Sequence, residues 1–226
     1  MTGPTIVCLH GLGRSGSDWD GVRPALERYG NVVVTDLPSA GLDALSSATA
    51  ELPAPAVLIG HSMGGIVAMR RAALQPTAVA GLILADSFFP PALNGRSRAA
   101  ALTDYGLHRA ALARELASRG ARPRPRRGTV QGMRSLARLG LRPSAFHATA
   151  CAVQTPVLVL HARDDHHVPV DFAIAAAGRH PAWTLELLDA GGHNVHADRP
   201  EQWLAAARGW LEDHLGERDG PLPGQV

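Results

Sequence analysis

The chain has 226 residues, of which 46% are hydrophobic and 19% are charged, and its formal net charge is +2. This length fits one well-packed domain, and the composition excludes a disordered or fibrous chain. No apolar run approaches the roughly 18 to 20 residues of a membrane span, and no secretory signal is visible at the N-terminus, so we expect a cytoplasmic protein without membrane contact.

Short apolar runs rich in β-branched residues alternate with longer helical patterns along the chain. The predicted strands are Thr5–Leu9, Val32–Thr35, Ala56–Ile59, Gly81–Ala85, Val157–His161 and Thr184–Leu188; the predicted helices lie near Trp19–Tyr29, Leu42–Leu52, Met63–Gln75, Val170–Gly178 and Pro200–Leu215. Strands that are apolar on both faces are typical of a buried parallel sheet. The alternation with helices therefore predicts an α/β fold with a mostly parallel sheet flanked by helices.

Two segments interrupt this alternation. Residues 88–153 contain no strand-like run and carry twelve arginines against Asp104 and Glu115, a charge of +10, whereas the rest of the chain carries −8. We predict that this segment is a helical, arginine-rich insertion, and that residues 1–87 and 154–215 form the core. Residues 216–226 have too little apolar surface to order themselves, and we expect a disordered tail. Cys8 lies in a predicted buried strand, so reduced thiols at Cys8 and Cys151 are favoured over a disulfide.

The segment Gly60-His-Ser-Met-Gly64 matches the pattern G-x-S-x-G between a predicted strand and a predicted helix. A serine at the tip of such a turn has a strained backbone and needs small neighbours, which Gly60, Gly64 and Gly65 supply. The following helix directs its N-terminal amides at the site, where they favour developing negative charge. This context predicts Ser62 as a nucleophile.

Polar residues follow two later strands of the predicted sheet. Asp164 and Asp165 come after Val157–His161, while His193 and His196 lie on and beyond the glycine-rich loop after Thr184–Leu188. Because the carboxyl ends of parallel strands meet at one edge of a sheet, we expect a carboxylate and a histidine to lie beside the serine. A serine nucleophile needs such a base and a group that orients the base.

These residues resemble the α/β-hydrolase family, and specifically its capped, esterase-like members, over Thr5 to Leu215 outside the insertion. The matching motifs are Leu9-His-Gly-Leu-Gly13, Asp36-Leu-Pro-Ser-Ala-Gly41 with Ser39 in place of a glycine, Gly60–Gly65, Asp165-His-His-Val-Pro169 and Gly192–Glu201. The resemblance implies Asp165 rather than Asp164 as the triad acid, and His193 rather than His196 as the base. It also implies that the insertion is a cap over Ser62, and that the first two strands of the family core are absent. The remaining six strands are then expected in the spatial order 2-1-3-4-5-6.

The resemblance further implies the roles of individual groups. His193 takes the proton of Ser62 as the serine attacks a carbonyl, and the backbone N–H groups of Leu12 and Met63 hold the oxyanion. We expect His10 to fix its loop through hydrogen bonds and His61 to be a structural neighbour of the serine.

Large apolar side chains of the insertion, together with Val195, are the candidates for substrate contacts. They are Phe88, Phe89, Tyr105, Met133, Phe146 and Val195, with Leu93, Leu107 and Leu136 as further pocket candidates. No histidine spacing matches a helical metal motif, so we expect neither a metal nor another cofactor.

Four functions remain open, and the first is hydrolysis of carboxylic esters or lactones. The second is a thioesterase or acyltransferase on acyl groups bound to coenzyme A or to an acidic carrier protein, which arginines of the cap would dock. The same arginines can also form a solvated surface without a partner. The third function is cleavage of a C–C bond, and the fourth is binding without turnover. Nucleic acid is not expected, because the basic segment has few aromatic residues and no binding motif.

Overall fold

The computed structural model describes residues 4–38, 40–90, 127–140 and 142–216. Within these residues, six strands form one parallel sheet in the order β2-β1-β3-β4-β5-β6. They are β1 (Thr5–Leu9), β2 (Asn31–Thr35), β3 (Ala56–His61), β4 (Val79–Ala85), β5 (Val157–Ala162) and β6 (Trp183–Leu188). The predicted fold class and strand order are confirmed.

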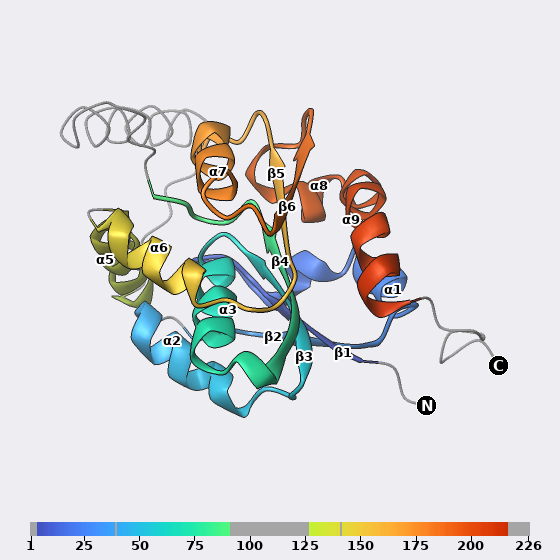
Figure 1. Cartoon of the computed structure of the whole chain (residues 1–226), viewed down its shortest axis with the longest axis horizontal. Coiled ribbons are helices and arrows are strands. Elements are labelled where there is room, and N and C mark those ends of the chain that lie inside the picture. The colour runs from blue at the N-terminus through green and yellow to red at the C-terminus, as the bar shows by residue number, and fades with distance from the viewer. Residues whose placement is uncertain (1–3, 39, 91–126, 141, 217–226) are drawn as a thin grey trace.

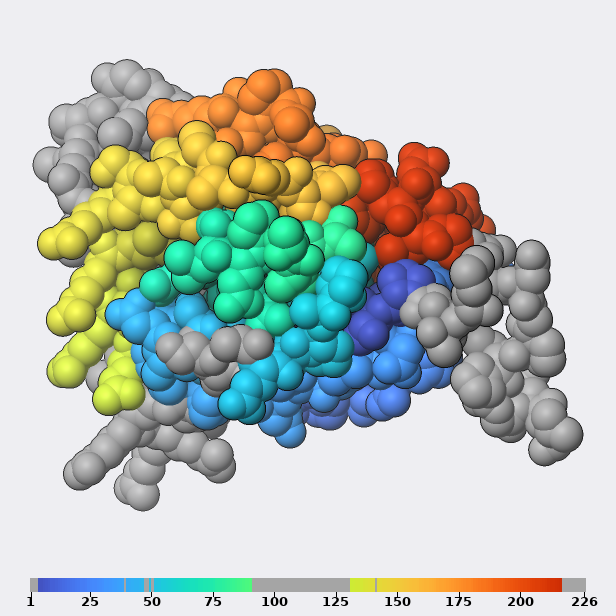
Figure 2. Space-filling view, turned by 60° about the horizontal axis from the view of Figure 1, so that its bottom comes forward, coloured from blue at the N-terminus to red at the C-terminus, as the bar shows by residue number. Residues whose placement is uncertain are grey.

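Helices cover both faces of this sheet (Figure 1). One face carries α2 (Leu42–Ala48), α3 (Met63–Leu74), α6 (Pro143–Cys151) and α7 (Val170–Ala177), and the other carries α1 (Arg23–Leu26), α8 (Val195–Asp198) and α9 (Pro200–Leu215). The helix α5 (Arg127–Gly140) contacts α2 and α6. Short 3-10 turns complete the described elements, at η1 (Gly16–Trp19), η2 (Thr49–Glu51), η3 (Pro76–Ala78) and η4 (Gly192–Asn194). In Figure 2, α3 lies between α2 and α6, which agrees with the contacts among these helices.

Alternating side chains of the strands supply two apolar cores, one on each face of the sheet. In β1, Val7 and Leu9 belong to the core on the α3 face of the sheet, whereas Ile6 and Cys8 belong to the core on the α9 face. All four side chains are fully buried, as expected for a central parallel strand. The sheet is therefore a rigid support for the loops at its carboxyl edge.

Three predictions need comment here. The first helix is much shorter than expected and covers only Arg23–Leu26. Pro24 lies in its first turn, where the missing proline N–H costs no intrahelical bond, so the helix begins at Arg23 and not at Trp19. Of the predicted insertion, residues 91–126 lie outside the described part, and its remainder contains the helices α5 and α6. The predicted tail also lies outside it, apart from Gly216.

Both cysteines are free, with Cys8 buried and Cys151 exposed. No described helix is long and apolar enough to cross a membrane.

Candidate active site

Ser62 lies on a strained turn directly between β3 and α3. Its φ of 52° is in a region that non-glycine residues rarely adopt. A Cβ at Gly60 would lie 2.5 Å from the Cα of Gly65, and a Cβ at Gly64 would lie 2.4 Å from the carbonyl oxygen of Leu9. Only glycine fits at these two positions because both contacts are with backbone. The turn thus holds the serine at the carboxyl edge of the sheet, as its sequence context predicted.

His193 lies between Ser62 and Asp165 and contacts both. The Nε2 atom of His193 is 3.0 Å from Ser62 Oγ, and its Nδ1 atom is 2.8 Å from Asp165 Oδ2. A carboxylate can only accept, so Nδ1–H donates to Asp165 and the lone pair on Nε2 faces the serine hydroxyl. This arrangement leaves the imidazole poised to accept the hydroxyl proton.

Asp165 is buried but stabilised as a carboxylate. Burial opposes its ionisation, but the hydrogen bond and charge of His193, together with His161, outweigh burial and hold the pKa of this carboxyl below its usual value. Its second oxygen, Oδ1, accepts the N–H groups of His167 and Val168 at 2.6 and 3.0 Å. The four contacts explain how the D-x-x-V-P segment keeps a charged acceptor behind the histidine.

Asp164, the alternative acid of the sequence analysis, bonds to two backbone amides of the loop before His193. Its Oδ1 accepts the N–H of Gly192 at 2.8 Å, and its Oδ2 accepts that of Gly191 at 3.3 Å. These bonds outweigh partial burial and lower the pKa of the Asp164 carboxyl. Asp164 therefore holds the backbone of the loop that carries His193. The sequence analysis did not foresee this contact.

His196, the alternative base, is fully buried between the rings of Trp19 and His61. Its ring packs 4.3 Å from Trp19 and 4.4 Å from His61, between ring centroids. Burial is the main reason why its pKa falls to about 3. His196 is thus a neutral core residue at ordinary pH.

The loop after β1 lies against the serine turn, and His10 ties it in place. The Nε2 atom of His10 accepts the N–H of Leu37 at 2.8 Å, and its Nδ1–H donates to the carbonyl oxygen of Gly11 at 2.8 Å. These are hydrogen bonds of the kind that the sequence analysis expected of His10. Met63 begins α3, so its N–H belongs to the first helical turn and lacks an intrahelical partner.

The helix α5 packs directly on this loop. A Cβ at Gly132 would lie 2.4 Å from Leu12 Cδ1 and 3.2 Å from Met63 Sδ. The described end of the insertion therefore reaches the two residues predicted to form the oxyanion hole.

Most of the predicted substrate contacts are buried side chains. Phe88, Phe89 and Phe146 belong to the core on the α3 face, with the Phe89 and Phe146 ring centroids 5.9 Å apart. Val195 lies in the opposite core and Met133 is 39% exposed, so the structure does not gather these residues into one surface. Leu136 is partly buried against the α3-side core. Tyr105, Leu93 and Leu107 lie outside the described residues.

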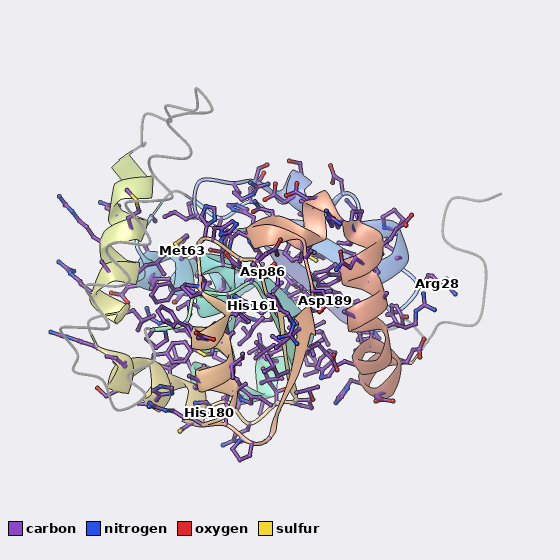
Figure 3. The ribbon with its side chains drawn as sticks, turned by 90° about the horizontal axis from the view of Figure 1, so that it is seen from above. Arg28, Met63, Asp86, His161, His180 and Asp189 are labelled. Atoms are coloured by element: carbon purple, nitrogen blue, oxygen red, sulfur yellow. The ribbon has the colours of Figure 1, made fainter. Side chains whose placement is uncertain are left out.

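A second buried carboxyl group, which the sequence analysis missed, lies close to Asp165. One oxygen of Asp86, one oxygen of Asp165 and one ring nitrogen of His161 all lie within 4.8 Å of one another. Figure 3 shows Asp86 and His161 in the middle of the molecule. Burial, and next the charge of Asp165, raise the pKa of Asp86 well above its usual value and so favour the protonated form of this carboxyl. The sequence signal that could have identified Asp86 is its position directly after the apolar strand β4.

Three groups of described residues have the spacing to hold a metal ion, but their other contacts do not favour one. Two of the groups contain Asp165, whose oxygens are already bonded to His193 and to two amides. In the third group, made of Asp18, His61 and His196, both oxygens of Asp18 contact the Arg14 guanidinium. A cation beside this arginine would be repelled.

Comparisons with known proteins agree with this fold. A profile described as "Alpha/beta hydrolase family" matches residues 6–207. A pimeloyl-[acyl-carrier protein] methyl ester esterase from Aromatoleum aromaticum is 29% identical over 238 aligned positions, which span 89% of this chain and 95% of that protein. The magnesium-chelatase 30 kDa subunit of Rhodobacter capsulatus is 28% identical over 251 positions, with coverage of 93% and 87%.

Among solved structures, the alpha/beta hydrolase enzyme MGS-MChE2, from a lagoon-sediment metagenome, superposes with a TM-score of 0.68 at 20% identity. The match covers 93% of this chain and 91% of that one. This similarity to a solved structure concerns the fold alone. The relatives in sequence have different names and so do not identify one substrate for this chain.

Proposed function

This chain belongs to the alpha/beta hydrolase family and is an esterase-type hydrolase. From this we propose that it cleaves carboxylic esters through an acyl-enzyme on Ser62. His193 is the general base and Asp165 orients it. The observation that carries the proposal is the continuous chain of contacts from Ser62 Oγ to His193 Nε2, at 3.0 Å, and from His193 Nδ1 to Asp165, at 2.8 Å.

In the first step, Ser62 Oγ attacks the ester carbonyl as its proton passes to His193 Nε2. The imidazolium that forms keeps its Nδ1–H bond to Asp165, and the buried carboxylate stabilises the new positive charge. His193 then gives the proton to the leaving alcohol, and the acyl group remains on Ser62. A water molecule activated by the same imidazole releases the acid and regenerates the serine.

The negative charge that develops on the carbonyl oxygen needs donors on the other side of the serine. The N–H of Met63, at the start of α3, is one proposed donor, and the helix dipole adds to it. The N–H of Leu12, on the loop tied by His10, is the second. A donor of this kind contributes about 10²- to 10³-fold to turnover.

Hydrolysis of a panel of short acyl esters by the wild type, Ser62→Ala and His193→Gln tests this proposal. Turnover by the wild type that falls at least 10³-fold in both variants supports it, since residual catalysis comes only from binding and the oxyanion donors. Equal turnover by the wild type and Ser62→Ala would refute it.

A second candidate, cleavage of an acyl ester or thioester on an acidic carrier protein, is favoured by three exposed arginines. Arg134, Arg138 and Arg142 follow one another at spacings of four residues, the first two on α5 and the third just before α6. Residues four apart lie on one face of a helix, so Arg134 and Arg138 share a face of α5. The forked guanidinium group suits carboxylates and phosphates, so this stripe offers an acidic partner several charge-assisted contacts. The relative from Aromatoleum aromaticum is named for a carrier-protein substrate.

Charge reversal separates the two candidates. If a carrier docks on the stripe, Arg134→Glu with Arg138→Glu raises KM for the carrier-bound substrate at least 10-fold and leaves a free short ester unaffected. Added salt has the same selective effect on the wild type, since screening weakens exposed charge pairs. Arg208→Glu, at an exposed position on α9, is the matched control. A carrier substrate that is insensitive to both changes excludes docking on this stripe.

A further inference from the structure

The loop that carries His193 has little conformational restraint of its own. Gly191 and Gly192 both have positive φ, at 144° and 67°, and a single 3-10 turn follows. The contacts from other parts of the chain therefore decide where the imidazole lies. Asp165 holds its ring and Asp164 holds the amides before it.

A third contact to this residue comes from the other side, from His61. The Nε2 atom of His61 is 2.7 Å from the backbone carbonyl oxygen of His193. A carbonyl only accepts, so His61 Nε2 carries the proton and donates it. His61 directly precedes Ser62, and this bond therefore joins the residue beside the nucleophile to the backbone of the base.

The ring of His61 is also confined on both of its other sides. A Cβ at Gly11 would lie 2.8 Å from His61 Nδ1 and 3.0 Å from its Cε1, so the ring lies directly against the loop after β1. The ring centroids of His61 and His196 are 4.4 Å apart, and those of His61 and His193 are 4.9 Å apart. His61 itself is fully buried. One side chain thus touches the loops of the nucleophile, the base and the proposed oxyanion donor.

Burial favours the neutral imidazole that this position needs. Removal from water, and next the neighbouring rings of His196 and His193, hold the pKa of His61 well below its usual value. The neutral ring carries one N–H, and the hydrogen bond to His193 assigns it to Nε2.

We propose that His61 is a positioning residue, whose Nε2–H fixes the backbone of His193 so that the imidazole stays within reach of Ser62. This role rests on the proposed function, because it acts through His193 as the base. It predicts an effect on kcat rather than on KM, since the bond holds a catalytic group and does not face a substrate. A displacement of about 1 Å in such a group can lower the rate on the order of 10²-fold.

Two variants separate the hydrogen bond from the packing of the ring. His61→Gln keeps an N–H donor at a similar distance along the side chain but removes the ring. His61→Phe keeps a flat ring against Gly11 and His196 but removes the donor. We expect kcat for a short ester to fall on the order of 10²-fold in His61→Phe and to stay within about 10-fold of the wild type in His61→Gln, with KM similar in all three.

The control is His214→Phe, which removes a ring-to-carbonyl hydrogen bond of similar length, 2.8 Å to Trp210, on α9. Its kcat should equal that of the wild type. Circular dichroism and thermal melting report the folded fraction of each variant, and kcat is taken per folded molecule. If His61→Phe does not fold, His61→Leu replaces it as the variant without a donor.

Full kcat in the folded variant without a donor would overturn the proposal. Equal loss in His61→Gln and His61→Phe would overturn it too, because packing and not the donor would then matter. A wild type that neither hydrolyses esters nor reacts with a fluorophosphonate, a reagent for activated serines, at Ser62 would instead refute the proposed function, so the two failures are distinguishable.

Discussion

Acid should destabilise this protein through His196, and the size of the effect follows from its burial. The pKa of His196 is lowered to about 3 in the folded chain, chiefly by burial, against 6.5 for an ordinary histidine. Between these two pH values His196 is protonated in the unfolded chain but neutral in the folded chain. Stability is therefore fully present above pH 6.5 and is lost as the pH falls towards 3.

Each pH unit in this window costs about 1.4 kcal/mol. At pH 4.5, two units below 6.5, His196 alone removes about 3 kcal/mol from the free energy of unfolding. His61 and His161, which are also buried with lowered pKa values, add to the same trend. Typical domains have only about 5 to 15 kcal/mol in total, so the loss is measurable.

The assay is urea unfolding, followed by tryptophan fluorescence, at several pH values between 7 and 4.5. We compare the slope of the unfolding free energy with pH in the wild type, His196→Phe and His196→Gln. Phe keeps a ring against Trp19 and Gln does not, so the two variants will differ in stability at pH 7. Both should nevertheless show a slope shallower by about 1.4 kcal/mol per pH unit. A slope unchanged from the wild type would refute the assignment of His196 as a buried neutral group.

Two pairs of substitutions test the geometry of the site. Asp165→Asn should lower kcat on the order of 10⁴-fold because the histidine loses its ionised partner. Asp164→Asn should cost far less, since an amide oxygen can still accept the N–H of Gly192 and only the longer bond to Gly191 is lost, and ester kinetics giving the reverse order would reassign the acid. Gly64→Ala should destabilise the fold by about 1 to 3 kcal/mol, because the new Cβ meets the backbone of Leu9. Its control, Gly209→Ala on α9, meets nothing within 4 Å and should stabilise by about 0.5 to 1 kcal/mol; thermal melting measures both, and equal effects would contradict the proposed close approach.

The central strands were predictable from the sequence because each is an apolar run, buried on both faces, that ends at polar or glycine residues. The edge strand β6 instead alternates, with Thr184 and Glu186 exposed. The strand order came from the family resemblance, and the structure has that order. The first helix was overestimated because its apolar pattern extends on both sides of Arg23–Leu26, whereas Pro24 suits only the first turn of a helix and so excludes a start at Trp19.

The contacts that hold the site were less accessible to prediction. His61 and His193 are 132 residues apart, and only the folded sheet brings them to 2.7 Å. The contacts of Asp164 with Gly191 and Gly192, and the closeness of Asp86 to Asp165, likewise join residues far apart in the sequence. Phe88 and Phe146 show the converse, because an apolar side chain near an active site looks the same in sequence whether it lines a pocket or fills the core.

The most direct test of the central claim is labelling with a fluorophosphonate, followed by peptide mass spectrometry, on the wild type and Ser62→Ala. An activated serine attacks the phosphorus and stays covalently modified, whereas ordinary serines do not react. We predict one modified peptide, which carries the label on Ser62 and is absent in Ser62→Ala. Labelling at another residue, or none in a folded wild type, would contradict the proposal that Ser62 is the nucleophile of this enzyme.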